Sequence, residues 1–454
     1  MTMNRFYANT VKTIACSLLA MTVAATTACS QNKATTPNPD KPVKEAEAAK
    51  KPVVLTVFSD TSLGGLGFDG TLDGFMKLYG SYVTKKYPHI SFKLILPAAG
   101  GEKLADLIAS KTSIDIRMAA VGMLRDNEKL QLGYDITDFT KLHQFDLNSL
   151  TPTALEWILA NSGGKVKALP VSLNSSVLFY NKDVFDKFAT PYPGDKLTWD
   201  ETIQLTNRLT RLDGSTQYLG YVSQPAWSNN FLRNQLSLPY LDAKTNRAVY
   251  ENGEWKKLFD QFASLYKIPG MENLNGAAAV DAFVKNQRVA MMKGNTELYA
   301  QMPKELNWDV TNLPSFKESP GVTEGATFFY WSVTTLSKNP EDAFLAMKEL
   351  ISPEVQTQMS RGGRSAVLKD KSIQQQFGAD VPELKGKNTK AMSPETFATP
   401  ILLGPYTLSV LSDLGNAFTS VITNKSDVNT ALRNAAESTN KTIAALIQAE
   451  GAAK

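Results

Sequence analysis

Residues 51–59 read KPVVLTVFS, residues 72–88 read LDGFMKLYGSYVTKKYP, and residues 89–97 read HISFKLILP. The first and third stretches are short apolar runs typical of buried strands, whereas the middle one places its apolar residues at helical spacing. The same order returns further along, with a helical stretch at 102–110 and a strand-like stretch at 113–122. This alternation predicts an α/β fold with a mostly parallel sheet that helices cover on both faces.

The segments at the ends of these strands are the expected position of a ligand site. In open parallel sheets, ligands bind beyond the carboxyl ends of the strands. Residues 59–69, 98–102 and 119–123 occupy that place in the sequence, and the first two of these segments are rich in glycine. We therefore expect all three to line a binding site at one edge of the sheet.

The length and composition of the chain predict two domains. It has 454 residues, of which 43% are apolar. Single hydrophobic cores stop growing at about 250–300 residues, so a chain of this length divides its apolar residues between two cores.

The N-terminus has the layout of a secretory signal over residues 1–28. Arg5 and Lys12 precede an uncharged apolar stretch at 13–25, which ends at Thr26-Thr27-Ala28-Cys29. The apolar stretch is shorter than the roughly 20 residues that span a bilayer core, which favours a signal over a permanent transmembrane helix. Cleavage before Cys29 would leave one cysteine in the mature chain, because Cys16 lies in the signal.

The junction before Cys29 resembles the cleavage site of bacterial lipoproteins. Ala28 fits that pattern, while Thr26 and Thr27 depart from it, so ordinary cleavage with free secretion stays open. The resemblance implies a lipid anchor on Cys29, palmitate included, at the outer face of the cell membrane, which is the periplasmic side in a diderm cell. Residues 29–52 contain almost no large apolar side chain and are expected to form a disordered tether.

The distribution of charge argues against a nucleic-acid partner. The whole chain carries a net charge of +4, and residues 1–51 alone, with seven basic and three acidic side chains, carry the same +4. The globular part is therefore neutral overall and lacks the positive excess that binds phosphate backbones.

A series of short motifs, each weak singly, follows in a fixed order along the chain. They are Leu169-Pro170, LFYNKDVF at 178–185, TWDE at 198–201, LGYV at 219–222 with Pro225-Ala226-Trp227, VAMM at 289–292, Leu313-Pro314, Ser332-Val333 and SKNP at 337–340. In their order and spacing these motifs resemble the extracellular solute-binding proteins that serve ABC importers of sugars and oligosaccharides, the family that contains maltose-binding protein. The resemblance covers nearly all of residues 53–454.

The resemblance implies a monomer with a two-lobed, periplasmic-binding-protein-like fold and a ligand cleft between the lobes. Residues 53–170 and 323–376 would form the N-terminal lobe, and residues 171–322 and 377–454 the C-terminal lobe. It also implies that the lobes close on a small molecule and that membrane subunits of an ABC importer recognise the closed form. The expected ligand is a sugar or oligosaccharide.

A sugar presents apolar C–H faces and a rim of hydroxyl groups, so its site needs aromatic side chains and planar polar groups. Trp227 is one candidate, because the polar loop SQPAWSNN surrounds it. Phe329, Tyr330 and Trp331 are others, since four consecutive aromatics in a strand must send two to each face. The alternative for all of them is core packing. Trp199 belongs to a helix-start motif and is not expected in the site.

Polar candidates follow from the expected geometry. Those at strand ends, at the crossing between lobes or in a Gly-Gly turn are Asp60, Ser62, Glu102, Asn174, Asn295 and Arg364. For the acids and amides the alternatives are a solvated loop or a helix cap. Arg361 and Arg364 flank Gly362-Gly363 and could hold a carboxylate or phosphate, which keeps an anionic ligand open against a plain surface turn.

The residue inventory disfavours most enzymes. Only two histidines, His89 and His143, are present, and the mature chain has no cysteine pair, so zinc sites and Cys-His nucleophiles are hard to build. The glycine-rich turn at 62–70 lacks the spacing of a P-loop or a dinucleotide loop. We expect no cofactor and no metal. A polysaccharide-degrading enzyme with two acids that meet in space, an adhesive lipoprotein of the same fold, and a receptor for peptides or anions stay open as alternatives.

Overall fold

The computed structural model describes residues 50–59, 70–96, 104–120, 127–128, 130–401 and 403–452. Residues 50–454 form one compact unit. The expected signal segment, Cys29 and most of the tether lie outside the described residues, and so do Asp60, Ser62 and Glu102. Within the described part of the chain, no helix combines the length and the apolar character needed to cross a membrane.

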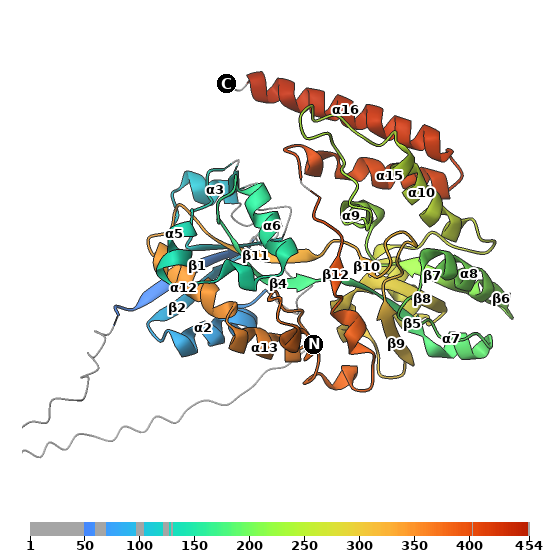
Figure 1. Ribbon diagram of the computed structural model, residues 1–454, viewed down its shortest axis with the longest axis horizontal. Coiled ribbons are helices and arrows are strands. Elements are labelled where there is room, and N and C mark those ends of the chain that lie inside the picture. The colour runs from blue at the N-terminus through green and yellow to red at the C-terminus, as the bar shows by residue number, and fades with distance from the viewer. Residues whose placement is uncertain are drawn as a thin grey trace, which may run out of the picture. The chain divides into compact units, whose positions relative to one another are not determined.

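The first sheet has five strands in the order β2-β1-β3-β11-β4 (Figure 1). Strand β1 pairs in parallel with both β2 and β3, as the sequence predicts, whereas β11 lies antiparallel between β3 and β4. Because β11 comes from much later in the chain, this lobe is assembled from distant segments. The strands are β1 Val53–Ser59, β2 Ile90–Ile95, β3 Ile116–Ala120, β4 Leu169–Asn174 and β11 Thr327–Val333.

Aromatic residues of β11 pack on both faces of the first sheet. Tyr330 stacks on Trp157 of α6, with ring centroids 5.2 Å apart, and Trp331 stacks on Phe75 of α1 on the other face at 5.8 Å. The helical segments of this lobe are α1 Leu72–Phe75, η2 Met76–Gly80, α2 Ser81–Lys86, α3 Leu104–Ala109, α5 Thr137–Leu142, η4 Leu147–Ser149, α6 Pro152–Asn161, α12 Pro340–Leu350, α13 Pro353–Arg361 and α14 Lys371–Gln374.

The second sheet has the order β6-β7-β8-β5-β9. Only β7 and β8 pair in parallel, while β5 is antiparallel to both of its neighbours. The second sheet is therefore mixed: β7, β8 and β9 run in one direction, and β5 runs opposite to both of its neighbours. The strands are β5 Ser176–Asn181, β6 Arg211–Asp213, β7 Thr216–Ser223, β8 Val289–Asn295 and β9 Trp308–Asn312.

Capping residues fix the helices that begin next to this sheet. At α8, the Thr198 side chain accepts from the backbone of Glu201, whose carboxylate accepts in return from the Thr198 backbone, which makes a capping box. Trp199, expected to be structural, is buried and donates to Gln235 at 2.6 Å. The helical segments here are α7 Lys182–Lys187, α8 Trp199–Leu209, α9 Trp227–Leu232, α10 Gly253–Tyr266, α11 Gly276–Val280, η5 Asp281–Lys285, η6 Thr296–Gln301, η7 Pro382–Leu384 and η8 Thr389–Met392.

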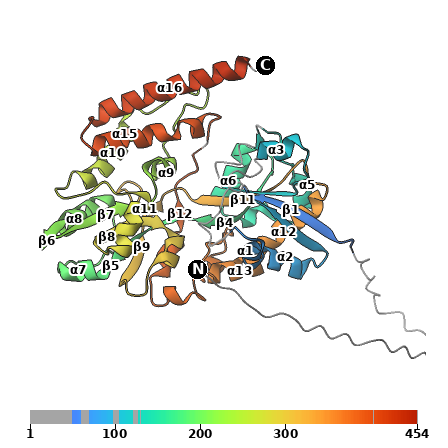
Figure 2. The ribbon, with the colours of Figure 1, turned by 180° about the vertical axis from the view of Figure 1, so that it is seen from behind.

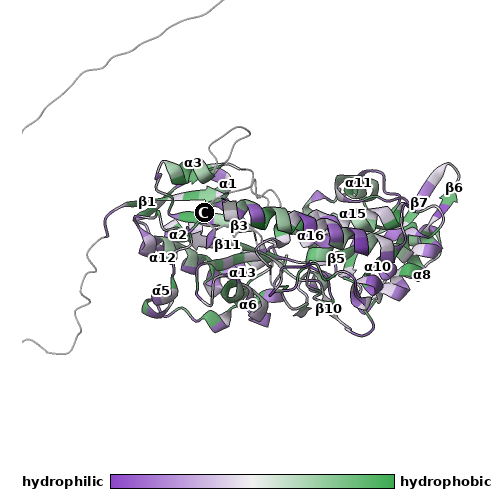
Figure 3. Cartoon of the chain, turned by 90° about the horizontal axis from the view of Figure 1, so that it is seen from above, coloured by the Kyte–Doolittle hydropathy of each residue, from purple (hydrophilic) through white to green (hydrophobic). Residues whose placement is uncertain are grey.

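The chain ends in a pair of helices that pack on α9 and α10 (Figure 2). They are α15 Leu411–Ile422 and α16 Val428–Ala452, preceded by the short η9 Thr407–Val410. Hydrophobic and hydrophilic residues alternate along α16, as an amphipathic helix that covers a core requires (Figure 3). Phe418 of α15 lies in the same core as Trp227, with 4.2 Å between the ring centroids.

Two segments connect the five-stranded sheets. Only Ser175 separates β4 of the first sheet from β5 of the second, and the return passage from β9 to β11 runs through residues 313–326. Strand β10, Val322–Thr323, pairs in parallel with β12, Thr396–Phe397, and both lie between the two sheets in Figure 1. The lobe boundaries given above stay a prediction, but these two links are where the backbone passes from one sheet to the other.

Candidate functional site

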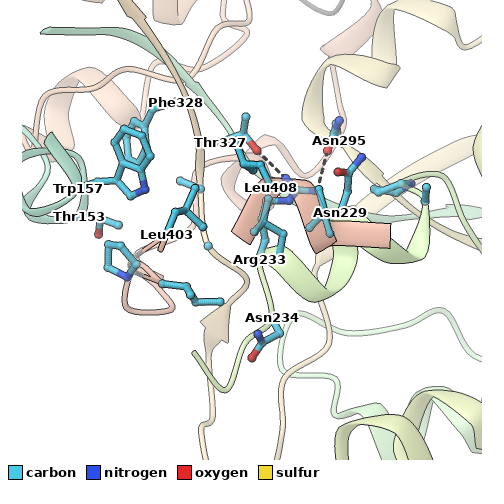
Figure 4. Close-up of a pocket in the computed structure, with 18 of the residues that line it drawn as sticks. Thr153, Trp157, Asn229, Arg233, Asn234, Asn295, Thr327, Phe328, Leu403 and Leu408 are labelled. Atoms are coloured by element: carbon cyan, nitrogen blue, oxygen red, sulfur yellow. Dashed lines mark hydrogen bonds between the residues drawn. The ribbon is translucent and has the colours of Figure 1, made fainter. Parts of the chain in front are cut away.

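A hollow of about 630 Å³ lies between elements of the two sheets, and we call it the Trp157 hollow (Figure 4). Trp157 of α6 and Phe328 of β11 line one side, and the end of α9 with Asn295 at the end of β8 lines the other. Aliphatic side chains that follow β12 close it further. Its lining residues include Trp157, Gln224, Asn229, Arg233, Asn295, Thr327 and Phe328.

A second hollow of about 730 Å³ adjoins the first, and we call it the Glu297 hollow. The turn that follows α13 and residues of α1 and η2 line it from the first lobe, and η6 lines it from the second. Of the described residues that line it, Lys77, Glu297 and Arg364 are charged. Gly363 has φ of +83°, and a Cβ there would overlap the Tyr299 hydroxyl, so glycine lets the two lobes approach at this point.

Gln224 and Asn295 line both hollows, so the two hollows meet at these side chains. Gln224 follows β7, and its backbone N–H donates to the Lys293 carbonyl of β8 at 2.8 Å. Asn295 is the last residue of β8 and pairs with Ser176 at the start of β5. Neighbouring strands of one sheet thus bring two carboxamides to the same edge.

A buried cluster of charged side chains lies next to these strand ends. Glu324, in the link between the sheets, forms ion pairs with Arg233 at 2.9 Å and with Lys293, and Ser176 donates to the same carboxylate. Burial opposes ionisation of Glu324, but the positive charges of Arg233 and Lys293 outweigh it and lower the pKa of Glu324. Arg233 also donates to Thr327 of β11 at 3.0 Å, so one guanidinium contacts both lobes.

The carboxyl group of Glu297 has a different environment. The side-chain nitrogen of Asn174 donates to it. The Thr296 hydroxyl group fixes that amide by donating to its side-chain oxygen, Asn174 Oδ1, at 2.6 Å. Burial raises the pKa of Glu297 to about 8, although the charge of Arg233 acts in the opposite direction. Near neutral pH this carboxyl is therefore mostly protonated and offers both a donor and an acceptor.

Three of the predicted site residues lie at the hollows. Asn295 lines both, Arg364 lines the Glu297 hollow, and Asn174 contacts Glu297. The predicted pair of arginines does not converge, because Arg361 instead donates to Asp380 at 2.8 Å.

The predicted aromatic residues lie in cores. Trp227 is 4% exposed and packs between Phe231, Phe262 and Phe418, away from the lining of either hollow. Tyr330 and Trp331 are buried on the two faces of the first sheet, and Phe329 is partly buried against the same core. Their neighbour Phe328 is the member of the aromatic run that lines the Trp157 hollow.

Sequence reasoning missed four residues that define the site: Trp157, Gln224, Arg233 and Glu297. Trp157 lies in an apolar helical stretch and gives no local signal of a binding role. Gln224 and Glu297, by contrast, lie two residues after the LGYV motif and two residues after Asn295, so their position after a strand was a usable signal.

Comparisons with known proteins agree with this architecture. Residues 82–385 match the family model described as bacterial extracellular solute-binding protein. The ABC substrate-binding protein from Listeria monocytogenes in complex with cycloalternan aligns with a TM-score of 0.69 and 19% identity, over 87% of this chain and 100% of that one. The sugar-binding protein MalE from Xanthomonas citri aligns with a TM-score of 0.67 and 14% identity, over 88% and 99%. At these identities the alignments establish the fold.

A curated relative matches over a shorter segment. The mannitol-binding protein of Pseudomonas aeruginosa is 25% identical over 128 residues, which are 27% of this chain and 28% of that protein. The match thus spans just over a quarter of the relative's length. The family match covers most of the chain, and the chain belongs to the bacterial extracellular solute-binding proteins.

Proposed function

We propose that this protein captures a carbohydrate between its two lobes and delivers it to an ABC importer. The family supports the role of a solute receptor, and several structural relatives carry sugars: the Listeria protein binds cycloalternan, and another relative was solved with mannotriose. The curated relative is a mannitol-binding protein. Polyhydroxylated ligands are common to these proteins.

The observation that carries the proposal is the side-chain oxygen of Gln224. It is buried where the two hollows meet and has no hydrogen-bond partner among the described residues. A buried acceptor without a partner is unfavourable, and a sugar hydroxyl is a donor that would satisfy it. Asn229 and Asn295 add planar amides beside it, and Trp157 and Phe328 add the aromatic surface that a pyranose face needs.

The test is a thermal-shift and calorimetry screen with residues 50–454, which make one compact unit containing the cores described above. The probes are neutral mono- and oligosaccharides, sugar alcohols, uronic acids, amino acids and peptides. A ligand at a hundred times its Kd stabilises the folded state by about 2.7 kcal/mol, which gives a measurable rise in Tm.

The matched variants are Gln224→Ala at the junction and Gln217→Ala on β7 away from the hollows. We expect a carbohydrate to raise Tm, and only Gln224→Ala to weaken that effect. A screen in which peptides bind and carbohydrates do not would overturn the carbohydrate assignment. Consumption of the sugar during incubation would instead support the enzyme alternative.

The same proposal places the protein at the outer face of the cell membrane, anchored through lipid on Cys29. It predicts that Cys29→Ala moves the protein from the membrane fraction to the soluble exported fraction and abolishes incorporation of labelled palmitate. Unchanged fractionation and no labelling of the parent protein would support ordinary secretion. We further propose that the receptor acts as a monomer, which light scattering checks with and without ligand.

A further inference from the structure

The Glu297 hollow differs from the Trp157 hollow in its charge. Its lining contains two cationic side chains, Lys77 and Arg364, both contributed by the first lobe. Among the described residues, Glu297 is the one carboxyl group in that lining, and it comes from the opposite lobe. The balance of charge in this hollow therefore depends on whether Glu297 is ionised and on how the two cations are paired.

Glu297 leaves the two cations largely uncompensated at neutral pH. Burial raises its pKa to about 8, so most molecules carry the neutral acid there. Two phenols near Arg364, Tyr79 and Tyr299, have raised pKa values because both are buried, and the charge of Glu383 adds to the shift of Tyr299. These phenols are neutral and provide hydrogen-bonding groups without charge.

Arg364 differs from the other arginines near the lobe junction. Arg233 pairs with Glu324 and Arg361 pairs with Asp380, whereas Arg364 has no carboxylate within 4 Å among the described residues. One guanidinium nitrogen of Arg364 donates to the Leu78 carbonyl at 3.1 Å, and the group lies 5.7 Å from the centre of the Tyr79 ring. These contacts fix its orientation and leave most of its five N–H donors available.

The residue that follows Arg364 supplies a second, independent signal. The hydroxyl group of Ser365 is buried, lines the same hollow and has no hydrogen-bond partner within the described ranges. A fixed guanidinium beside an unsatisfied hydroxyl suits a planar, charged acceptor with two oxygens. A neutral sugar hydroxyl would satisfy Ser365 without balancing the charge of Arg364.

We infer that the Glu297 hollow binds the carboxylate of an acidic sugar, with Arg364 as the principal contact, Ser365 as a second donor and Lys77 as a nearby positive charge. This inference rests on the proposed function and specifies its substrate class as uronic acids or their short oligomers. The rest of the ligand would extend past Gln224 and Asn295 into the Trp157 hollow.

The experiment compares each acidic sugar with its neutral counterpart by isothermal titration calorimetry on residues 50–454. The pairs are galacturonate with galactose, glucuronate with glucose, and digalacturonate with galactobiose. We expect at least one acid to bind about tenfold or more tightly than its neutral partner, and this preference to shrink as ionic strength rises.

Three variants assign that preference to the site. Arg364→Gln should abolish the preference for the acid while changing the Kd of the neutral partner less than about threefold, and Arg364→Lys should restore part of it. Arg433→Gln on the exposed face of α16 removes the same charge far from the hollow and should change neither Kd.

The outcomes separate this inference from the proposed function. Equal affinity for acid and neutral partner, or an equal loss of both in Arg364→Gln, overturns the acidic-sugar assignment while the carbohydrate receptor stands. The absence of binding by all six sugars overturns the acidic-sugar assignment, and the thermal-shift screen with the wider set of probes then decides whether the carbohydrate receptor stands. A preference that survives in Arg364→Gln shows that the carboxylate binds elsewhere.

Discussion

Arg233 Nη2 and Glu324 Oε1 lie 2.9 Å apart, and this ion pair joins the end of α9 to the segment that links the two sheets. The two side chains are 11% and 2% exposed. Lys293, which is 4% exposed, pairs with the same carboxylate. One anion therefore holds two cations in an environment where an unpaired charge is strongly unfavourable.

Replacing Glu324 should destabilise the protein more than replacing any exposed acidic residue. Glu324→Gln leaves Arg233 and Lys293 buried without their counter-ion, so we expect the free energy of unfolding to fall by about 3–5 kcal/mol. Urea denaturation measures it. Glu318→Gln, which breaks the half-exposed pair with Lys257, should change it by less than about 1 kcal/mol.

A second variant distinguishes lost charge pairing from a general packing defect at Glu324. Adding Lys293→Met to Glu324→Gln removes one stranded cation and should recover part of the stability. No recovery in the double variant would contradict the account given for this cluster.

A side chain at position 363 should destabilise the folded protein as long as Tyr299 keeps its hydroxyl group. Gly363→Ala places a Cβ on that hydroxyl and also holds alanine at φ of +83°, so we expect a loss of about 2–4 kcal/mol from overpacking and backbone strain together. Gly321→Ala, at φ of +73° with open space around it, should lose only the backbone part, about 1 kcal/mol. Thermal unfolding with Tyr299→Phe in both backgrounds checks the cause, because removal of the hydroxyl should recover part of the overpacking loss in Gly363→Ala and nothing in Gly321→Ala.

Glu297 makes stability depend on pH between about 4.5 and 8. Its pKa rises from 4.5 to about 8 on folding, so in this window the folded protein holds a proton that the unfolded chain releases. The contribution of Glu297 to stability is therefore complete below the lower value and is lost as pH rises through the upper one. Within this window the free energy of unfolding falls by at most about 1.4 kcal/mol per pH unit because of Glu297.

The check is the difference in unfolding free energy between the parent and Glu297→Gln, measured in urea from pH 5 to pH 8.5. We expect the parent curve to fall relative to the variant as pH rises. Glu354→Gln, at an exposed acid on α13, should run parallel to the parent. A parallel curve for Glu297→Gln as well would show that the carboxyl ionises normally in the folded protein.

Trp157 and Trp227 should respond differently to the same conservative change. Trp157 lines a hollow, so Trp157→Phe removes part of the surface that faces the ligand and should weaken sugar binding about five- to tenfold. Trp227 lies in the core with Phe418, so Trp227→Phe should lower Tm and leave the Kd unchanged. Titration calorimetry on both variants decides, and a larger loss of affinity in Trp227→Phe would restore the sequence-based assignment of Trp227 to the site.

The fold could be predicted from the sequence where local chemistry determines the structure. Apolar runs such as residues 53–59 became buried strands, Thr198 began a helix with a capping box, and Pro340 occupies the first turn of α12. The mixed pairing of the second sheet could not be predicted in this way. Strand β5 has the composition of any buried strand, and its direction depends on the one-residue link that precedes it.

The site was harder to predict because burial and partners are properties of the tertiary structure. The run 328–331 was expected to divide between two faces, and it does, but both faces of the sheet are covered and only Phe328 reaches a hollow. Trp227 follows a polar loop, yet α9 turns it towards α15. Arg233 and Glu324 are distant in sequence, and no local pattern indicates that they meet.

In the capture of a ligand between two lobes proposed above, the one-residue link at Ser175 would act as a very short pivot. The distance that a point moves in a rotation is proportional to its distance from the pivot. A rotation of a few degrees at Ser175 would therefore move the hollows beside it little and the far ends of both lobes much more. Two fluorophores attached at those distant ends would therefore record small events beside the pivot as large changes in distance. A rotation at this link would thus be smallest in its effect where the ligand is held and largest at the lobe surfaces farthest from Ser175.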